Sequence, residues 1–218
     1  MSLLRKRSAT PEEQAFQAAI SERFDPDNDD ANDGSVDADP DQQNSGEDVD
    51  GPPTLNFGAL RVPAVDGMQV RAELDDQKQV VGVAVMVDET MLQLQAFAAP
   101  KSENLWDEVR QEIAEGIRGG QGKAREVDGP FGRELQAEVA VSDESGVTSR
   151  QPVRFIGIDG DRWFLRGVIT GTGATDRAGA GAVEEIFAGV TVERGSHAAA
   201  PRDQLPLTLP TDPSLVAE

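Results

Sequence analysis

Three arginine side chains are the groups in this sequence best suited to binding chemistry. Arg162 and Arg166 have the same parity in a predicted strand, and Arg154 lies in the strand before it. If the strand register aligns them, their guanidinium groups form a positive spot that could hold an acidic ligand or a partner segment. The acidic stretch of the same chain is a further candidate occupant. The alternative is a set of surface ion pairs, each of which contributes little to stability.

A glycine-rich loop follows these arginines in the chain. Gly171, Thr172 and Gly173 come after a predicted strand and before a predicted helix. The backbone N–H groups of such a loop can hold an anion at a helix N-terminus. The third glycine of a dinucleotide-binding fingerprint is missing, because Asp176 occupies its position. The loop is therefore interpreted either as an anion site or as a flexible connection between two elements.

Residue counts exclude several catalytic and metal-binding chemistries. The chain has no Cys and no Tyr, and its single His is His197. This excludes disulfides, thiol catalysis and zinc sites of His and Cys, and argues against a Ser–His–Asp triad. Residues 25–36 alternate like a calcium loop at first, but Asp30 and Val36 stand where Gly and Glu are required. We predict no catalytic residue, metal or cofactor, although paired carboxylates stay available for acid–base chemistry.

The charge of the chain is concentrated in one segment. Residues 25–50 hold eleven acidic side chains and no Lys or Arg, in a chain of 218 residues with a net charge of −20. Like charges repel and the segment has little apolar area to bury, so we expect a disordered linker over residues 25–53. The negative charge of the molecule should also repel phosphate backbones, and general nucleic-acid binding is not expected.

The hydrophobic pattern of the remaining chain predicts the elements that must position these residues. Residues 68–74 alternate, residues 80–87 are nearly all apolar, and residues 91–98 return as a third strand. Short turns between the three indicate an antiparallel meander. A helix with Ser102 as its cap follows, because apolar residues recur every four positions from Leu105. Gly119 and Gly120 end this helix.

A second run of strands and a second helix follow the first helix. The strands begin near Lys123 and include residues 133–141, 153–158 and 162–170, with an Asp-Gly hairpin turn at residues 159–160. Asp176 is the predicted cap of the second helix. We therefore predict an α+β domain over residues 54–194: an antiparallel sheet of about six strands in the order βββαβββα, with two helices packed on one face.

The two ends of the chain have different compositions. Residues 1–24 combine the basic cluster at residues 5–7 with a short amphipathic helix that begins near Thr10. This head could dock on a partner, anchor weakly to a membrane surface, or remain a frayed tail. Residues 195–218 are rich in Pro and are predicted as a disordered tail. No apolar run is long enough to span a bilayer and no signal peptide is recognised, so a cytoplasmic location is expected.

Two segments of the predicted domain carry a resemblance to a known family. Residues 128–135 (DGPFGREL) and 163–171 (WFLRGVITG), with the basic start and acidic linker, resemble an uncharacterised actinobacterial family. That family is catalogued only as a domain of unknown function. The resemblance covers about residues 54–194 and the head. It implies a cytosolic actinobacterial protein and carries no activity and no site residues.

These observations favour a non-enzymatic binding or adaptor domain with a protein partner. The sequence pattern predicts a hydrophobic core, but no group of residues in it matches a known catalytic arrangement. An enzyme that uses Asp or Glu carboxylates with Arg or a divalent ion on an anionic metabolite is the alternative. Peripheral membrane association through residues 1–24 is a second alternative. The oligomeric state is left open.

Overall fold

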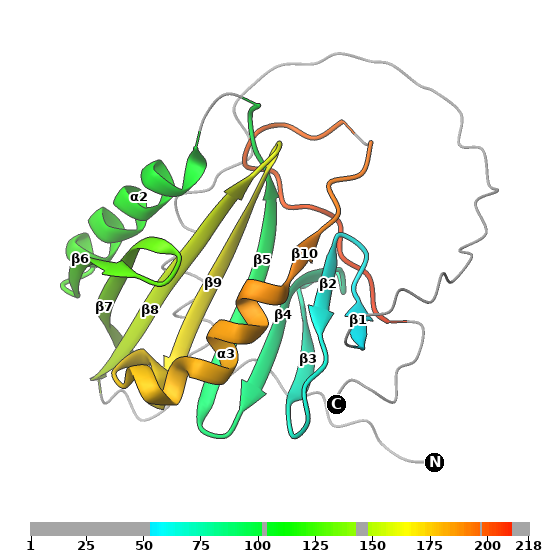
Figure 1. The fold of residues 1–218 in the computed structure, drawn as a ribbon. Coiled ribbons are helices and arrows are strands. Elements are labelled where there is room, and N and C mark those ends of the chain that lie inside the picture. The colour runs from blue at the N-terminus through cyan, green and yellow to red at the C-terminus, as the bar shows by residue number, and fades with distance from the viewer. Residues whose placement is uncertain (1–52, 102–103, 143–147, 197, 211–218) are drawn as a thin grey trace.

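A seven-stranded antiparallel sheet forms the main layer of the fold (Figure 1). The computed structural model describes residues 53–101, 104–142, 148–196 and 198–210. The strands of this sheet are β3 (Gln69–Leu74), β4 (Val80–Val87), β5 (Thr90–Ala98), β6 (Lys123–Gly129), β7 (Gly132–Ser142), β8 (Thr148–Gly160) and β9 (Trp163–Gly171). They lie in the order β3-β4-β5-β9-β8-β7-β6, so β9 joins the two sequential runs of strands.

Two-residue turns fix the register of the hairpins. Val87 pairs with Thr90 between β4 and β5, and Gly160 pairs with Trp163 between β8 and β9. Asp88 and Arg162, one in each turn, have positive φ angles. Tight turns of this kind match the twist of the flanking strands. The predicted hairpins are therefore confirmed, but the position of the second turn was wrong. Asp159 and Gly160 lie in β8, and the turn is formed by Asp161 and Arg162, so Arg162 is not in a strand.

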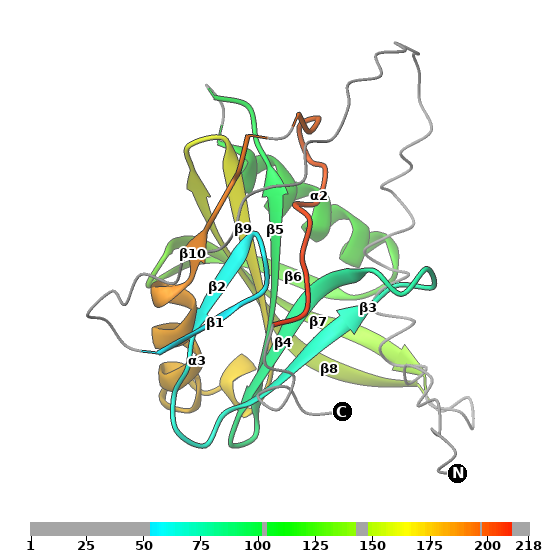
Figure 2. The same cartoon turned by 90° about the vertical axis from the view of Figure 1, so that its right-hand side faces the viewer.

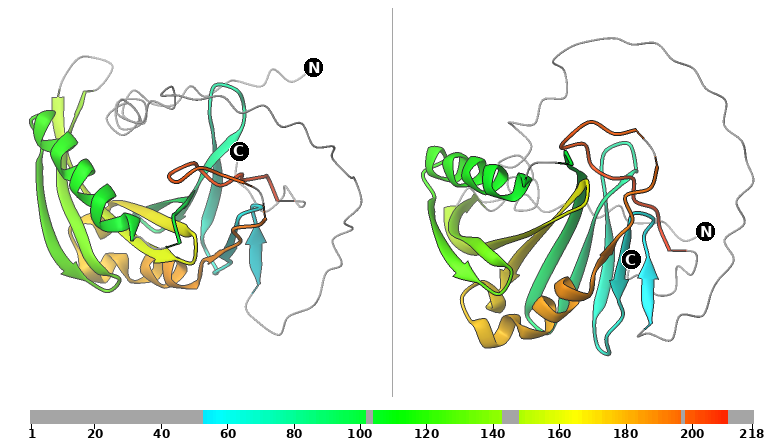
Figure 3. Two further views of the ribbon diagram at one scale, coloured as in Figure 1. Left: turned by 90° about the horizontal axis from the view of Figure 1, so that it is seen from above. Right: turned by 45° about the horizontal axis from the view of Figure 1, so that its top comes forward.

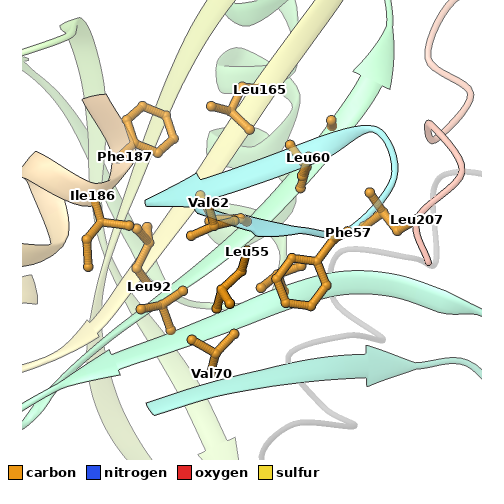
Figure 4. Close-up of a cluster of buried hydrophobic side chains, with 14 of the residues drawn as sticks. Leu55, Phe57, Leu60, Val62, Val70, Leu92, Leu165, Ile186, Phe187 and Leu207 are labelled. Atoms are coloured by element: carbon orange, nitrogen blue, oxygen red, sulfur yellow. The ribbon is translucent and has the colours of Figure 1, made fainter. Parts of the chain in front are cut away.

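A small second sheet covers one face of the main sheet. It contains β1 (Thr54–Asn56), β2 (Leu60–Pro63) and β10 (Thr191–Val192), in the order β1-β2-β10. Leu55, Phe57 and Leu60 from this sheet are buried in the larger of two hydrophobic clusters. Figure 4 shows how they meet Leu92 of β5 and Ile186 of a helix. The small sheet is thus a lid on the core and not an extension of the main sheet.

The two helices lie on opposite faces of the main sheet (Figure 3). Helix α2 (Leu105–Gly119) covers β6, β7 and β8, and α3 (Arg177–Gly189) covers β2, β4 and β5. The neighbouring residues Phe155 and Ile156 of β8 point to opposite faces and belong to the two different clusters. We call the two sides the α2 face and the α3 face. The prediction of two helices on one face was therefore wrong.

The α+β class is confirmed, but the strand count and order differ from the prediction. Two short strands precede the meander, and four strands lie between α2 and α3 in place of the three predicted. The extra strand is β6, which pairs with β7 along its whole length. The run of alternating charged residues in β6 lacks the apolar alternation that marked the other strands.

Helix α2 receives its N-terminal cap from a distant strand. Its N-cap residue Asn104 makes no side-chain cap hydrogen bond, while Asp159 of β8 accepts from the backbone N of Leu105 at 2.9 Å. The same carboxylate accepts from the N of Trp106 at 3.2 Å. The predicted cap Ser102 lies outside the described residues. In α3 the predicted cap is confirmed, since Asp176 accepts from the N of Ala178 at 3.0 Å.

The C-terminal segment packs on the sheet where β4 separates from β5. Leu205 N donates to Ala96 O at 2.8 Å, and Ala98 N donates to Asp203 O at 2.7 Å. Figure 2 shows the segment beside β4 and β5. Leu205 is buried in the core, and Arg202 pairs with Glu108 and Glu112 of α2. The prediction of a disordered tail from residue 195 was wrong for residues 198–210.

Some predicted segments fall outside the described residues. These are the head over residues 1–24, the acidic linker up to residue 52, and the tail from residue 211. The internal residues 102–103, 143–147 and 197, which include His197, lie outside them as well. Within the described part of the chain, no helix is long and apolar enough to cross a membrane.

Candidate functional site

Arg154 lies on the α3 face, buried between two carboxylates of the same chain. Its Nη2 donates to Glu134 Oε2 at 2.9 Å and to Glu184 Oε1 at 2.7 Å, and its Nη1 donates to Gly173 O at 3.2 Å. Burial alone lowers the pKa of Arg154, but the hydrogen bonds that it donates to Glu134 and Glu184, and the charges of these carboxylates, raise it above its ordinary value. The carboxylates of Glu134 and Glu184 therefore already occupy the position beside Arg154 that an anionic ligand would take.

Arg162 lies at the tip of the β8–β9 hairpin, away from Arg154. Its side chain is exposed and its backbone φ is 64°. Its carbonyl accepts from Ala99 N at 3.0 Å and from Arg194 Nε at 3.1 Å. Its contribution to the fold is therefore made by the backbone, which joins the hairpin to the end of β5.

Backbone N–H groups of the predicted anion loop are engaged within the chain. Gly171 has a φ of 77°, and a Cβ there would collide with the carbonyl oxygen of Glu89. Thr172 N donates to Glu89 O at 3.1 Å, and Gly173 N donates to Thr90 Oγ1 at 2.9 Å. The loop then continues as the single 3-10 turn η1 (Thr172–Ala174). Its glycines are explained by the tight connection to the β4–β5 turn.

Arg166 lies on the α2 face, opposite Arg154. In the sheet register Arg166 pairs with Gln95 and with Gly157, and the ring of Trp106 from α2 lies against Gly157. Arg154 pairs with Ile169, whose side chain is in the cluster under α3. The structure therefore separates the three arginines and brings only Arg154 to the glycine loop. Anion binding by any of these six residues stays a prediction.

Arg166 lies among polar side chains on the α2 face that form two hydrogen-bonded pairs and that we call the polar row: Glu73, Gln93, Gln95 and Arg166. The Nη2 of Arg166 donates to Gln95 Oε1, and Gln95 Nε2 donates to Val81 O at 3.2 Å. Gln93 Nε2 donates to Glu73 Oε2. Gln93, Gln95 and Arg166 are buried, and Glu73 is half-buried. The row thus crosses β3, β5 and β9 on one face of the sheet.

Two glycines leave room for the side chains along this row. A Cβ at Gly82 of β4 would lie 2.5 Å from Glu73 Oε2, so the carboxylate crosses β4 over a position without a side chain. A Cβ at Gly157 of β8 would lie 2.5 Å from Cδ2 of Trp106. The missing side chains therefore let Glu73 reach β5 and let Trp106 close the other end of the row.

An aromatic stack supports the guanidinium group of Arg166. Its Cζ lies 5.3 Å from the ring centroid of Phe97, which stacks on Phe164 at 5.9 Å. Phe164 stacks in turn on Trp106, with 5.7 Å between the ring centroids. The negative face of an aromatic ring attracts a cation most strongly where water is excluded. The stack thus holds Arg166 in place without neutralising its charge.

Among the described residues of the main sheet, Arg166 is the buried charged side chain with the fewest polar partners. It is 5% exposed, its single hydrogen bond to a described residue goes to the neutral Gln95 amide, and its Nε has no partner there. Burial lowers the pKa of Arg166 to about 10, although the charge of Glu73 opposes this shift. The guanidinium is still charged at neutral pH, and a nearby anion would stabilise it.

Sequence reasoning selected Arg166 but missed its partners. Gln93 and Gln95 stand two residues apart in β5, between Leu92, Leu94 and Ala96. Two polar residues on one face of an otherwise apolar central strand are a signal that could have identified them. Glu73 gives no such signal, because it lies in an alternating strand where charged residues are ordinary. Only the pairing of β3 with β4, which sets Glu73 opposite Gly82, brings its carboxylate within reach of Gln93.

The residues around the polar row show no metal-binding constellation. Within the described part of the chain, no group of three or more His, Asp or Glu side chains is arranged to hold a metal ion. The arrangement offers a fixed cation, two amides and one carboxylate. Such a set can bind and orient an anionic group, and Glu73 could also accept a proton.

A family model matches most of the chain. The family model described as "Protein of unknown function (DUF3710)" matches residues 34–215, which is more than half of the chain. The match includes part of the acidic linker and nearly all of the C-terminal segment. No curated protein matches the chain.

Proposed function

We propose that this chain, which belongs to the DUF3710 family of proteins of unknown function, is a non-enzymatic binding domain that takes an anionic group of its partner at Arg166. The observation that carries the proposal is the incomplete compensation of a buried guanidinium. Arg166 is 5% exposed and its Nε has no hydrogen-bond partner among the described residues. An unsatisfied buried donor costs about 1–3 kcal/mol, and more if it is charged. A ligand that supplies an acceptor would recover this free energy.

The surroundings of Arg166 favour a protein as the partner. Met86 and Met91 lie on the α2 face, one cross-strand row beyond Ala84 and Gln93. Both methionines are half-buried, and neither belongs to the two hydrophobic clusters. Flexible apolar side chains of this kind adapt to varied partner surfaces. An anion-binding guanidinium beside adaptable apolar contacts supports recognition of a polypeptide segment.

The proposal is tested by direct observation of the Arg166 side chain in the full-length protein. The Nε–H resonance of Arg166 is assigned by its loss in Arg166→Lys and followed during titration with acetate, inorganic phosphate and chloride at constant ionic strength. We expect acetate, phosphate or both to shift it more than chloride does. Arg125→Lys is the matched control, because Arg125 is exposed and bonds only to Gln136 in the described structure. No shift beyond the chloride response would overturn the proposal.

One observation favours an enzyme as a second candidate. Glu73 is hydrogen-bonded by Gln93 and is close enough to Arg166 to oppose the lowering of its pKa. A carboxylate beside a guanidinium can act as a base on an anionic substrate that the arginine holds. The two candidates differ in the fate of the ligand. An enzyme would convert a bound anionic metabolite, and Glu73→Gln would stop product formation but not binding, as measured by mass spectrometry of the recovered ligand.

A further inference from the structure

We propose that the group bound at Arg166 is a carboxylate and that it takes the place of Glu73 beside the guanidinium. This inference rests on the proposed function and names the class of ligand. It is carried by three features of the polar row: the number of hydrogen-bond donors, the local charge, and the presence of an internal carboxylate that an incoming one can replace.

The guanidinium of Arg166 is the only charged donor group in the polar row. The Nε2 groups of Gln93 and Gln95 already donate to Glu73 and to Val81 O. Within the polar row, the Nε of Arg166 is the buried side-chain nitrogen without a partner among the described residues; outside the row, the Nε atoms of Arg61, Arg110 and Arg154 share this feature. The two oxygens of a carboxylate match the parallel N–H groups of one guanidinium. A phosphate has three acceptor oxygens and is usually held by several charged donor groups, whereas the row supplies one.

The local charge also favours a ligand with a single negative charge. Arg166 and Arg71, the exposed charged residue next to Glu73 along this face of β3, carry two positive charges, and Glu73 carries one negative charge. One carboxylate would therefore neutralise the group, whereas a doubly charged phosphate would leave an excess negative charge. The net charge of −20 adds a general repulsion against the more highly charged ligand.

Glu73 is the internal carboxylate whose charge acts on Arg166, and the carboxylate of the ligand would replace it in this role. Its charge raises the pKa of Arg166 against the effect of burial, so the two groups attract each other. It reaches this position across Gly82 and is held by Gln93. Arg166 is nearly fully buried, so an incoming group must displace a neighbour. The half-buried Glu73 has the same chemistry as the proposed ligand and lies toward the sheet edge on β3.

The experiment compares carboxylates with phosphate on the full-length protein and on Glu73→Gln. The probes are acetate, hexanoate, a blocked Ala-Glu-Ala peptide and inorganic phosphate, with the Arg166 Nε–H resonance as the readout. We expect Glu73→Gln to bind the carboxylates about tenfold more tightly, because the internal competitor is gone. Glu138→Gln is the matched control, since Glu138 is partly exposed and pairs with the exposed Lys123. Its affinity for the probes should equal that of the native chain.

The possible outcomes separate this inference from the function on which it rests. Tighter binding of the peptide than of hexanoate would assign the carboxylate to a polypeptide, and the reverse order to a small acid; both support the inference. Preference for phosphate would overturn the inference and leave the proposed function standing. No probe-dependent shift at Arg166 would overturn both. Weaker carboxylate binding by Glu73→Gln would show that Glu73 helps to hold the ligand and is not replaced by it.

Discussion

Arg154 and Arg166 are both buried in the same sheet, but their charges are compensated to different degrees. Arg154 is 3% exposed and bonds to two carboxylates and a carbonyl, whereas Arg166 bonds to one amide among the described residues. The Nε of each arginine lacks a partner among the described residues, so the difference lies in the carboxylates that pair with Arg154. A buried charge that is paired with opposite charges anchors a fold, and a buried charge without such a partner reduces stability. The first arginine is therefore interpreted as structural and the second as functional.

Replacement of Arg154 should destabilise the protein strongly. Arg154→Met leaves Glu134 and Glu184 close together with no cation between them, and breaking a buried pair in this way costs about 3–5 kcal/mol. Urea denaturation of the full-length chain measures the loss. Lys123→Met, which breaks the exposed pair with Glu138, should cost about 1 kcal/mol or less. Equal losses in the two variants would contradict a structural role for Arg154.

Replacement of Arg166 should change stability by about 1 kcal/mol or less at neutral pH, because an apolar side chain removes an under-compensated charge. The pH dependence has a defined sign. The pKa of Arg166 is about 10 in the fold and higher in the unfolded chain, so the cost of its charge is present below pH 10. That cost is relieved as the pH rises through this value. The native chain should therefore gain stability relative to Arg166→Met above pH 10 in urea denaturation. A constant difference would contradict the assignment.

At the scale of elements, α2 depends on a cap that is remote in sequence. Asp159→Ala removes the acceptor for two backbone N–H groups and should cost about 1 kcal/mol, whereas Asp159→Asn keeps an acceptor and should cost less. Burial first, and the charge of Asp107 second, raise the pKa of Asp159 in the fold. Its carboxyl therefore favours the fold below the ordinary aspartate pKa and loses this contribution as pH rises through the folded value. The advantage of the native chain over Asp159→Asn should shrink from acid to neutral pH in thermal melts.

The C-terminal segment should contribute to stability although it has no regular secondary structure over most of its length. Leu205 is 1% exposed in the core, and Leu205→Ala should cost about 2–5 kcal/mol. Leu209, four residues later, is 57% exposed and provides the matched control, with an expected change of about 0.5 kcal/mol or less for Leu209→Ala. Hydrogen exchange at the amide of Ala98, which donates to Asp203 O, should accelerate only in the first variant. Similar behaviour of the two variants would mean that the segment is not part of the folding unit.

Local patterns predicted most elements but not their relations across the sheet. The strands β3, β4 and β5, the β8–β9 hairpin and the Asp176 cap follow from alternation, turn residues and capping chemistry. The faces taken by the two helices could not be predicted, because β4 and β8 carry apolar residues on both sides. The segment around Leu205 was hidden by its prolines. The separation of Arg154 and Arg166 depends on the register of β8 with β9, which no local signal gives.

At the scale of the whole molecule, the candidate site is a single under-compensated cation in a strongly negative protein. The acidic residues 25–50 supply eleven of the negative charges and lie outside the described residues. A general basic surface would bind anions by long-range attraction and lose them with salt. Binding at Arg166 would instead depend on short-range contact in a desolvated position, against a repulsive long-range field. The two kinds of site therefore respond to ionic strength with opposite signs.

This difference leads to a prediction for the acidic segment. Replacement of its eleven acidic residues by Asn or Gln in the full-length chain should strengthen carboxylate binding at low ionic strength, where the screening length is about 30 Å. The gain should vanish at physiological salt, where that length is about 8 Å. The Nε–H resonance of Arg166 in the ligand-free protein should not move, because the segment acts only through its field. If the resonance moves and the gain persists at all salt concentrations, the segment itself occupies Arg166 as an internal carboxylate ligand, and the field explanation is wrong.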